Sequence, residues 1–192
     1  MKILIIRHGE QSSRVCNADV PLSERGKEQA ERLAADKTMQ GIEAVYASGL
    51  TRARQTAEII AGAAGVPVII RSGLAEMDFG EFTGLSHAER IEREKRLSAE
   101  THGRLSGRPY PGGESYEEVF GRIRPVLEEI TSSGYECAAV VSHLEAIRAM
   151  LSGMIGLPFD HAKLLCKGLP HTGTAEIFYD RDRGLYFLRK LG

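Results

Sequence analysis

The sequence predicts one α/β domain over residues 1–192 with a mainly parallel central sheet. Short apolar runs alternate with amphipathic stretches of helix length, which is the pattern of parallel strands joined by helices. A chain of 192 residues has the usual length of a single domain. Its 42% hydrophobic and 27% charged residues exclude a disordered or low-complexity protein.

Six strands and five helices are predicted, and they alternate along most of the chain. The strand candidates are the apolar runs Lys2–Ile6, Glu43–Tyr46, Pro67–Ile70, Cys137–Val141, Ala175–Tyr179 and Leu185–Leu188. The helix candidates are Ser23–Ala35, Leu50–Ala64, Ser86–Thr101, Ser115–Ser132 and Leu144–Met154. We interpret residues 180–184 as the turn of a hairpin between the last two strands.

Two of these helices begin with the spacing of a capping box, Ser86 with Glu89 and Ser115 with Glu118. Pro125 lies inside the second of them and should kink or split it. The first is crowded with charged residues over positions 89–96. That helix is either a solvated surface helix or a lid whose Arg and Lys side chains choose a ligand.

Charge and cysteine content exclude several classes of protein. The formal net charge of −1 and the pI near 6.6 give no basic field for nucleic acid or an anionic membrane. Cys16, Cys137 and Cys166 are far apart and lack C-x-x-C spacing, so we expect neither disulfides nor a zinc site. No apolar run approaches the ~18 residues of a membrane span, and the N-terminus does not have the pattern of a secretory signal. We therefore expect a cytoplasmic protein that binds neither nucleic acid nor membrane.

Two arginines and two histidines follow predicted strands at one edge of the sheet. Arg7 and His8 follow the first strand, His143 follows the fourth, and Arg52 lies in the first turn of the helix after the second. Ligands of such sheets bind outside the carboxyl ends of the strands, so these side chains should share one crevice. Each residue alone is more often solvated or structural, but their coincidence predicts an anion site.

A phosphate monoester fits such a cluster better than a carboxylate does. It carries about 1.5–2 negative charges and three acceptor oxygens, which two guanidinium groups and two imidazoles would satisfy. A neutral imidazole is a nucleophile when one nitrogen is bare and the other is held by an acceptor such as a backbone carbonyl. The sequence contains no P-loop, nucleophile elbow, zinc helix or cysteine phosphatase loop.

A series of motifs runs in a fixed order from residue 2 to about residue 155. These motifs are Leu4–Glu10, Pro21–Gly26, Val45–Ser48, Leu50–Ala53, Leu74–Gly80, Pro111–Ser115 and Val141–His143. In this order they resemble the histidine phosphatase superfamily, the branch that contains cofactor-dependent phosphoglycerate mutases and small-molecule phosphatases. The resemblance implies a single-domain three-layer α/β/α fold with a helical lid inserted around residues 82–110.

The same resemblance implies a role for each residue of the cluster. His8 would be the nucleophile that becomes phosphohistidine, and Arg7, Arg52 and His143 would form the phosphate pocket. Glu76 would protonate the leaving group and then activate water. No metal and no cofactor are implied, because the arginines supply the positive charge.

Glu76 can act as an acid only if its pKa is raised toward the operating pH. Burial would raise the pKa, and so would neighbouring carboxylates, for which Glu10, Asp78 and Glu81 are candidates in the sequence.

The chain departs from the family pattern at two places near the expected pocket. The position six residues after His8 is commonly Asn in the family but is Arg14 here, which leaves Asn17 as a candidate phosphate ligand. Leu144 and Glu145 follow the second histidine, where Gly-Gly or Gly-Asn is common. Leu144 can still present its backbone N–H to phosphate, whereas Glu145 would disfavour highly charged substrates.

We therefore expect a metal-independent phosphatase that hydrolyses a phosphomonoester of a small metabolite through a phosphohistidine. A phosphoglycerate mutase-type transferase is an alternative, although mutases of this family are longer and exclude water from the site. A phosphohistidine protein phosphatase is favoured if the pocket is shallow. A phosphate-binding module without turnover is suggested by Arg14 and Leu144-Glu145 alone. The sequence is compatible with a homo-oligomer and does not predict one.

Overall fold

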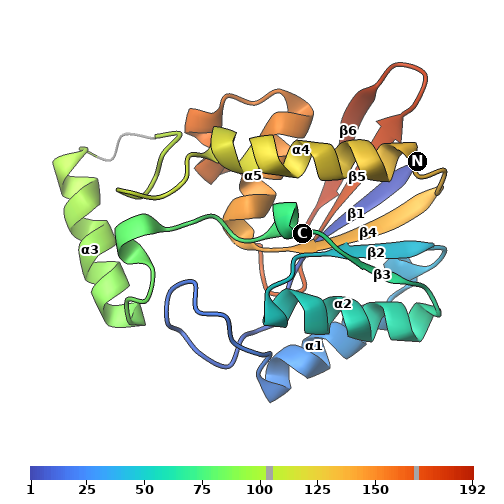
Figure 1. The fold of residues 1–192 in the computed structure, drawn as a ribbon, viewed down its shortest axis with the longest axis horizontal. Coiled ribbons are helices and arrows are strands. Elements are labelled where there is room, and N and C mark those ends of the chain that lie inside the picture. The colour runs from blue at the N-terminus through green and yellow to red at the C-terminus, as the bar shows by residue number, and fades with distance from the viewer. Residues whose placement is uncertain (103–105, 167–168) are drawn as a thin grey trace.

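The computed structural model describes residues 1–102, 106–166 and 169–192 of the chain. Within these residues six strands form one sheet in the order β3-β2-β4-β1-β5-β6 (Figure 1). The strands are β1 (Lys2–Arg7), β2 (Ala44–Ala47), β3 (Val68–Ile70), β4 (Cys137–Ser142), β5 (Thr174–Asp180) and β6 (Leu185–Leu191). The four strands β1 to β4 are parallel to one another, whereas β5 and β6 form an antiparallel hairpin that joins the sheet beside β1.

The helices cover both faces of the sheet, as the three-layer prediction requires (Figure 1). They are α1 (Glu24–Ala34), α2 (Thr51–Ala64), α3 (His87–Glu100), α4 (Tyr116–Ser132) and α5 (Leu144–Ile155). Helices α1 and α2 pack on one face and α4 and α5 on the other, while α3 stands away from the sheet. The predicted α/β/α architecture with a helix in the inserted segment is confirmed, and residues 103–105 of that segment lie outside the described residues.

Alternating residues of β1 build the two cores between these layers. Ile3 and Ile5 are fully buried in the core that α4 and α5 cover. Leu4 and Ile6 are buried in the core that α1 and α2 cover. Because both faces of the central strands are covered, these strands are nearly continuous apolar runs, which is why the sequence shows them so clearly.

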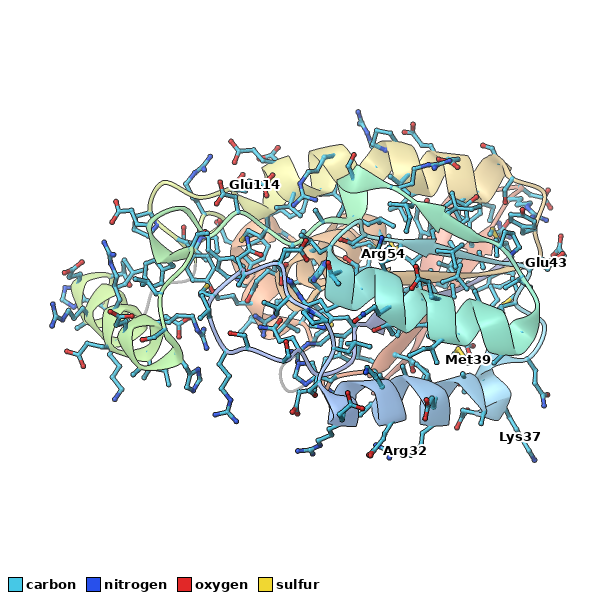
Figure 2. All side chains as sticks on the ribbon, turned by 60° about the horizontal axis from the view of Figure 1, so that its bottom comes forward. Arg32, Lys37, Met39, Glu43, Arg54 and Glu114 are labelled. Atoms are coloured by element: carbon cyan, nitrogen blue, oxygen red, sulfur yellow. The ribbon has the colours of Figure 1, made fainter. Side chains whose placement is uncertain are left out.

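On the face of the sheet covered by α1, polar side chains point to the outside and apolar side chains fill the core. Figure 2 shows Arg32 and Lys37 pointing away from the protein at the end of α1 and just after it. Met39, in the short 3-10 helix Lys37–Met39, is turned inward and is buried in the core beneath α2.

All predicted strands and helices are present in the described structure, with ends that differ from the predicted ones by at most three residues. Both capping boxes form, at Ser86 and at Ser115. Of the two outcomes expected at Pro125, a kink or a split, the split does not occur, because α4 runs without a break from Tyr116 to Ser132. Pro125 and Gly121, whose carbonyl loses its helical donor, are both exposed, so water can satisfy that carbonyl.

None of the helices among the described residues is both long enough and apolar enough to cross a bilayer.

Candidate active site

The register of the parallel strands brings the predicted histidines together. Arg7 is paired with Ser142 across β1 and β4, and the His8 N–H donates to the Ser142 carbonyl at 3.0 Å. The rings of His8 and His143 consequently lie 5.0 Å apart, centroid to centroid. Both residues are buried at the carboxyl ends of their strands, with 4% and 0% of their surface exposed.

The backbone holds the His8 ring in one tautomer. Its Nδ1 lies 2.6 Å from the Gly9 carbonyl oxygen, which can only accept, so Nδ1 carries the proton. Nε2 is then bare, and it accepts a hydrogen bond from Arg52 Nε at 3.2 Å. Burial, and next the charge of Arg52, lowers the pKa of His8 well below its usual value, so the imidazole is neutral near pH 7.

Close packing of two glycines fixes the turn that carries His8. A Cβ on Gly9 would lie 2.5 Å from the Gly26 carbonyl oxygen, and a Cβ on Gly26 would lie 2.0 Å from the Glu10 carbonyl oxygen. Neither position accepts a side chain, because the first turn of α1 lies directly against the turn after β1. The Gly9 N–H also donates to Thr56 Oγ1 of α2 at 3.0 Å.

Arg52 contacts the bare nitrogen of His8, and Arg7 lines the same pocket. Arg52, which is 3% exposed, comes from the first turn of α2 and donates through Nη1 to the Ala18 carbonyl. Arg7 donates from Nη1 to the Leu169 carbonyl at 2.7 Å and from Nη2 to His171 Nε2 at 3.2 Å. Its Nε is buried and has no partner among the described residues.

His143 is the last residue before α5 and is held by the end of β2. Its Nε2 lies 2.9 Å from Ser48 Oγ, and its Nδ1 is buried without a partner within the described part of the chain. Burial and then the neighbouring His8 lower the pKa of His143 well below its usual value. A neutral His143 has one ring N–H, which can donate to a bound oxyanion.

Glu76 lines the same pocket as His8 and is anchored by the start of α5. Its Oε1 accepts from the Met77 N–H at 2.9 Å and from the Ala146 N–H at 3.0 Å. Both bonds end on Oε1, so the other oxygen can carry a proton. Burial, and next the charge of Glu145, raises the pKa of Glu76. The neighbours Glu10, Asp78 and Glu81 suggested by the sequence are not among the main causes, because Asp78 and Glu81 are exposed and Glu10 lies toward Arg25.

Glu145 lines the pocket, as expected from the sequence, and its charge is paired. Its carboxylate is buried and lies 2.7 Å from Arg148 Nη1, and it also accepts a hydrogen bond from the Tyr116 hydroxyl. The repulsion of highly charged substrates by Glu145 stays a prediction.

Asn17 and Leu144, the two other predicted phosphate ligands, line the same pocket as His8. Asn17 adopts a left-handed backbone with φ of 53° and donates from Nδ2 to the Met77 carbonyl. Its Oδ1 is buried and has no partner among the residues described. Leu144 is the first residue of α5, so its N–H belongs to the helix N-terminus, where intrahelical acceptors are lacking.

Apart from His143, which is fully buried and does not line it, these side chains surround one pocket of about 360 Å³. Sequence reasoning missed His171, whose ring centroid lies 5.6 Å from that of His8. It precedes β5, and because β5 is antiparallel to β1 its start lies at the same edge as the end of β1. The predicted hairpin could have pointed to His171, but the sequence did not show which of its two strands pairs with β1.

Within residues 1–102, 106–166 and 169–192, no three His, Cys, Asp or Glu side chains converge in a way that could ligate a metal ion.

One pocket thus holds a buried imidazole with a bare nitrogen, two arginines and a carboxyl group whose pKa is raised, an arrangement that can bind a phosphoryl group. The family model of the histidine phosphatase superfamily (branch 1) matches residues 3–186. The chain therefore belongs to this superfamily, as its motifs predicted.

Among characterised relatives, phosphoserine phosphatase 1 of Hydrogenobacter thermophilus is 31% identical over 195 residues, which cover 96% of this chain and 90% of that protein. The probable phosphoglycerate mutase GpmB of Escherichia coli O1:K1 / APEC is 31% identical over 169 residues, which cover 82% of this chain and 76% of the relative. The relatives thus include both phosphatases and mutases.

Solved structures share the whole fold. A mycobacterial glucosyl-3-phosphoglycerate phosphatase in complex with VO3 has a TM-score of 0.85 and 26% identity, covering 100% of this chain and 98% of its own. The alpha-ribazole phosphatase of Shigella flexneri has a TM-score of 0.80 and 23% identity, covering 100% and 96% of the two chains. Because the identity to the alpha-ribazole phosphatase is only 23%, this similarity shows a shared fold and nothing more.

Proposed function

We propose that this protein is a metal-independent phosphatase that hydrolyses a phosphomonoester of a small metabolite through a phosphohistidine on His8. The observation that carries the proposal is the fixed tautomer of His8. Its Nδ1 proton is held by the Gly9 carbonyl, and its bare Nε2 accepts from Arg52. The phosphatases among its relatives support the same class of reaction.

In the first step His8 Nε2 attacks phosphorus, and the bond from phosphorus to the leaving oxygen breaks. Arg7, Arg52 and His143 would stabilise the charge on the phosphoryl oxygens, a kind of contribution that is typically worth about 3–4 kcal/mol per donor. Glu76 gives its proton to the leaving oxygen, which departs as an alcohol.

In the second step water attacks the phosphorus of the phosphohistidine. Glu76, now a carboxylate, takes a proton from that water, the bond from phosphorus to Nε2 breaks, and inorganic phosphate leaves. Glu76 ends protonated and His8 ends neutral, so the enzyme returns to its starting state. A carboxyl group with a raised pKa suits both halves of this cycle.

The mouth of the pocket carries the residues that would select the metabolite. Arg14, His87 and Arg90 line it from the loop after β1 and from α3. Of the crowded cations of α3, Arg93 and Arg96 lie outside this pocket. The solvated interpretation therefore suits most of the helix, and Arg90 is the cation that we assign to substrate recognition.

Hydrolysis of p-nitrophenyl phosphate in EDTA tests the proposal. We expect wild-type protein to release nitrophenol and His8→Ala to lose the activity, because Ala offers no nucleophile. His161→Ala is a matched control, since it removes an exposed histidine that does not line the pocket. A full rate in His8→Ala, or a rate that requires added metal, would contradict the proposal.

A mutase activity is the second candidate, because one group of relatives is named as probable phosphoglycerate mutases. A mutase must keep water from its phosphohistidine. Incubation with 3-phosphoglycerate separates the two candidates, since a phosphatase releases inorganic phosphate and a mutase yields the isomeric phosphoglycerate.

We assign the reaction to the cytoplasm. Cys16, Cys137 and Cys166 all remain free thiols in the structure, which supports a reducing compartment.

A further inference from the structure

A second buried carboxylate, Glu145, lies beside the candidate proton donor and has no part in the reaction steps above. Glu145 is in the first turn of α5, and 8% of its side chain is exposed. The next residue, Ala146, donates its N–H to Glu76 Oε1 at 3.0 Å. Both glutamates line the same pocket. The side chains of Glu76 and Glu145 therefore both lie at the start of α5.

Hydrogen bonds from two side chains hold the carboxylate of Glu145 in a fixed position. Arg148 Nη1 donates to one carboxylate oxygen at 2.7 Å, and the Tyr116 hydroxyl donates to the other. Arg148 is itself held, because its Nε donates to the Leu165 carbonyl at 3.1 Å. Burial and the charge of Glu145 raise the pKa of Tyr116, so the phenol keeps the proton that it donates. Hydrogen bonds of this kind, with an ionised acceptor, are the strong ones.

We propose that Glu145 is a positioning residue: its negative charge, fixed by Tyr116 and Arg148, keeps a proton on Glu76 until the leaving oxygen takes it. This inference rests on the proposed function, in which Glu76 is the proton donor.

The balance of charges around Glu76 makes such a residue necessary. Two backbone N–H groups and Arg52 favour the ionised form of Glu76, whereas burial and Glu145 favour the protonated form. The titratable and charged groups that surround the two carboxyls are Arg7, His8, Cys16, Arg52, Tyr110, Tyr116, Arg122, Arg148 and Cys166. The arginines in this set favour ionised Glu76, and Glu145 opposes them.

Three variants separate the charge of Glu145 from its shape. Glu145→Gln keeps the size and the acceptor oxygen but removes the charge. Glu145→Gln combined with Arg148→Gln removes both charges of the pair, so it excludes an effect of an uncompensated Arg148. Asp78→Asn is the matched control, because it removes an exposed carboxylate two residues from Glu76.

Carbon-13 NMR of protein labelled at the glutamate side-chain carboxyl carbons measures the titration of Glu76 directly, with the signal assigned by its loss in Glu76→Gln. We expect the midpoint to move to lower pH by about one unit in Glu145→Gln. The double variant should shift less, because it also removes a cation that favours ionised Glu76. Asp78→Asn should titrate like wild type. An unchanged midpoint in Glu145→Gln, an equal shift in Asp78→Asn, or a shift to higher pH in the double variant would overturn the inference. This measurement does not depend on activity.

The pH dependence of kcat/KM then tests whether the proton on Glu76 takes part in the reaction. The value of kcat/KM for phenyl phosphate should fall as pH rises through the pKa of Glu76, because the proton is needed on the leaving oxygen. In Glu145→Gln this fall should begin about one pH unit lower, which is about a tenfold loss on the alkaline side. Hydrolysis of p-nitrophenyl phosphate should lose less, since p-nitrophenolate leaves without a proton. A shifted NMR midpoint with equal kinetics for both substrates would overturn the donor role of Glu76 while leaving His8 as the nucleophile.

Discussion

The two sides of the pocket are built in different ways. On the side of the sheet, His8, His143 and Arg52 are almost fully buried at strand ends and at the start of α2. On the side of α3, no residue of the helix is buried, and its charges are paired near the surface, as between Arg90 and Glu94 at 2.6 Å. The buried side holds the chemistry in fixed positions, whereas the exposed side can change its residues at small cost to the fold.

This difference explains why the residues on the buried side of the pocket could be predicted from the sequence and those on α3 could not. Buried strands leave continuous apolar runs, and the charged residues that interrupt them, such as Arg7 and His8, stand out against that background. The side chains on α3 follow no such pattern. Arg90 and Arg96 look alike in the sequence, and the structure is needed to show that Arg90 lines the pocket and Arg96 does not.

Two further features of the site depend on long-range contacts that no local pattern encodes. His171 reaches the pocket because β5 runs against β1, and the sequence predicted a hairpin without its partner strand. Tyr116 reaches Glu145 only because α4 packs against α5. Arg148, in contrast, lies three residues after Glu145 on the same predicted helix, which is a spacing that favours ion pairs.

The largest effect is expected on the buried side, from loss of Arg52. Arg52→Ala should lower kcat for p-nitrophenyl phosphate by about 100- to 1000-fold, because it removes a preorganised donor from the developing phosphoryl charge. Arg54→Ala on the exposed face of the same helix is the control (Figure 2). Steady-state kinetics of the two variants should differ by this factor, and equal rates would remove Arg52 from the site.

Substitutions in the buried core should lower the free energy of unfolding more than substitutions on α3. Ile5→Ala creates a cavity in a fully buried strand and should lower the free energy of unfolding by about 2–5 kcal/mol. Leu97→Ala on α3 removes a partly buried side chain and should cost much less. Urea unfolding followed by circular dichroism measures both. Equal losses would mean that α3 is part of the core.

A smaller effect on catalysis is expected from the loss of His171, which accepts a hydrogen bond from Arg7. His171→Ala removes one acceptor of the Arg7 guanidinium, so kcat/KM should fall by about 2- to 10-fold. Burial, and then Arg7, lowers the pKa of His171 to about 4, so the histidine is neutral near pH 7 and its loss removes an acceptor rather than a charge. An effect as large as that of Arg52→Ala would instead place His171 among the catalytic groups.

The smallest effect concerns selection on the exposed side. Arg90→Ala should raise KM for the best anionic metabolite of a substrate screen by about 2- to 5-fold, as expected for an exposed charge, and should leave p-nitrophenyl phosphate unaffected. Arg96→Ala should change neither. A loss of activity toward both substrates in Arg90→Ala would give α3 a part in the chemistry.

The nitrogen of His8 that carries the phosphoryl group tests the central claim most directly. Glu76→Gln, which lacks the base for the second step, should accumulate phosphoenzyme from p-nitrophenyl phosphate. After denaturation in alkali, phosphorus-31 NMR should then show a single phosphohistidine substituted at Nε2, and it should vanish when His8 is replaced by Ala. Phosphate on Nδ1, on another residue, or on no residue during turnover would contradict the account.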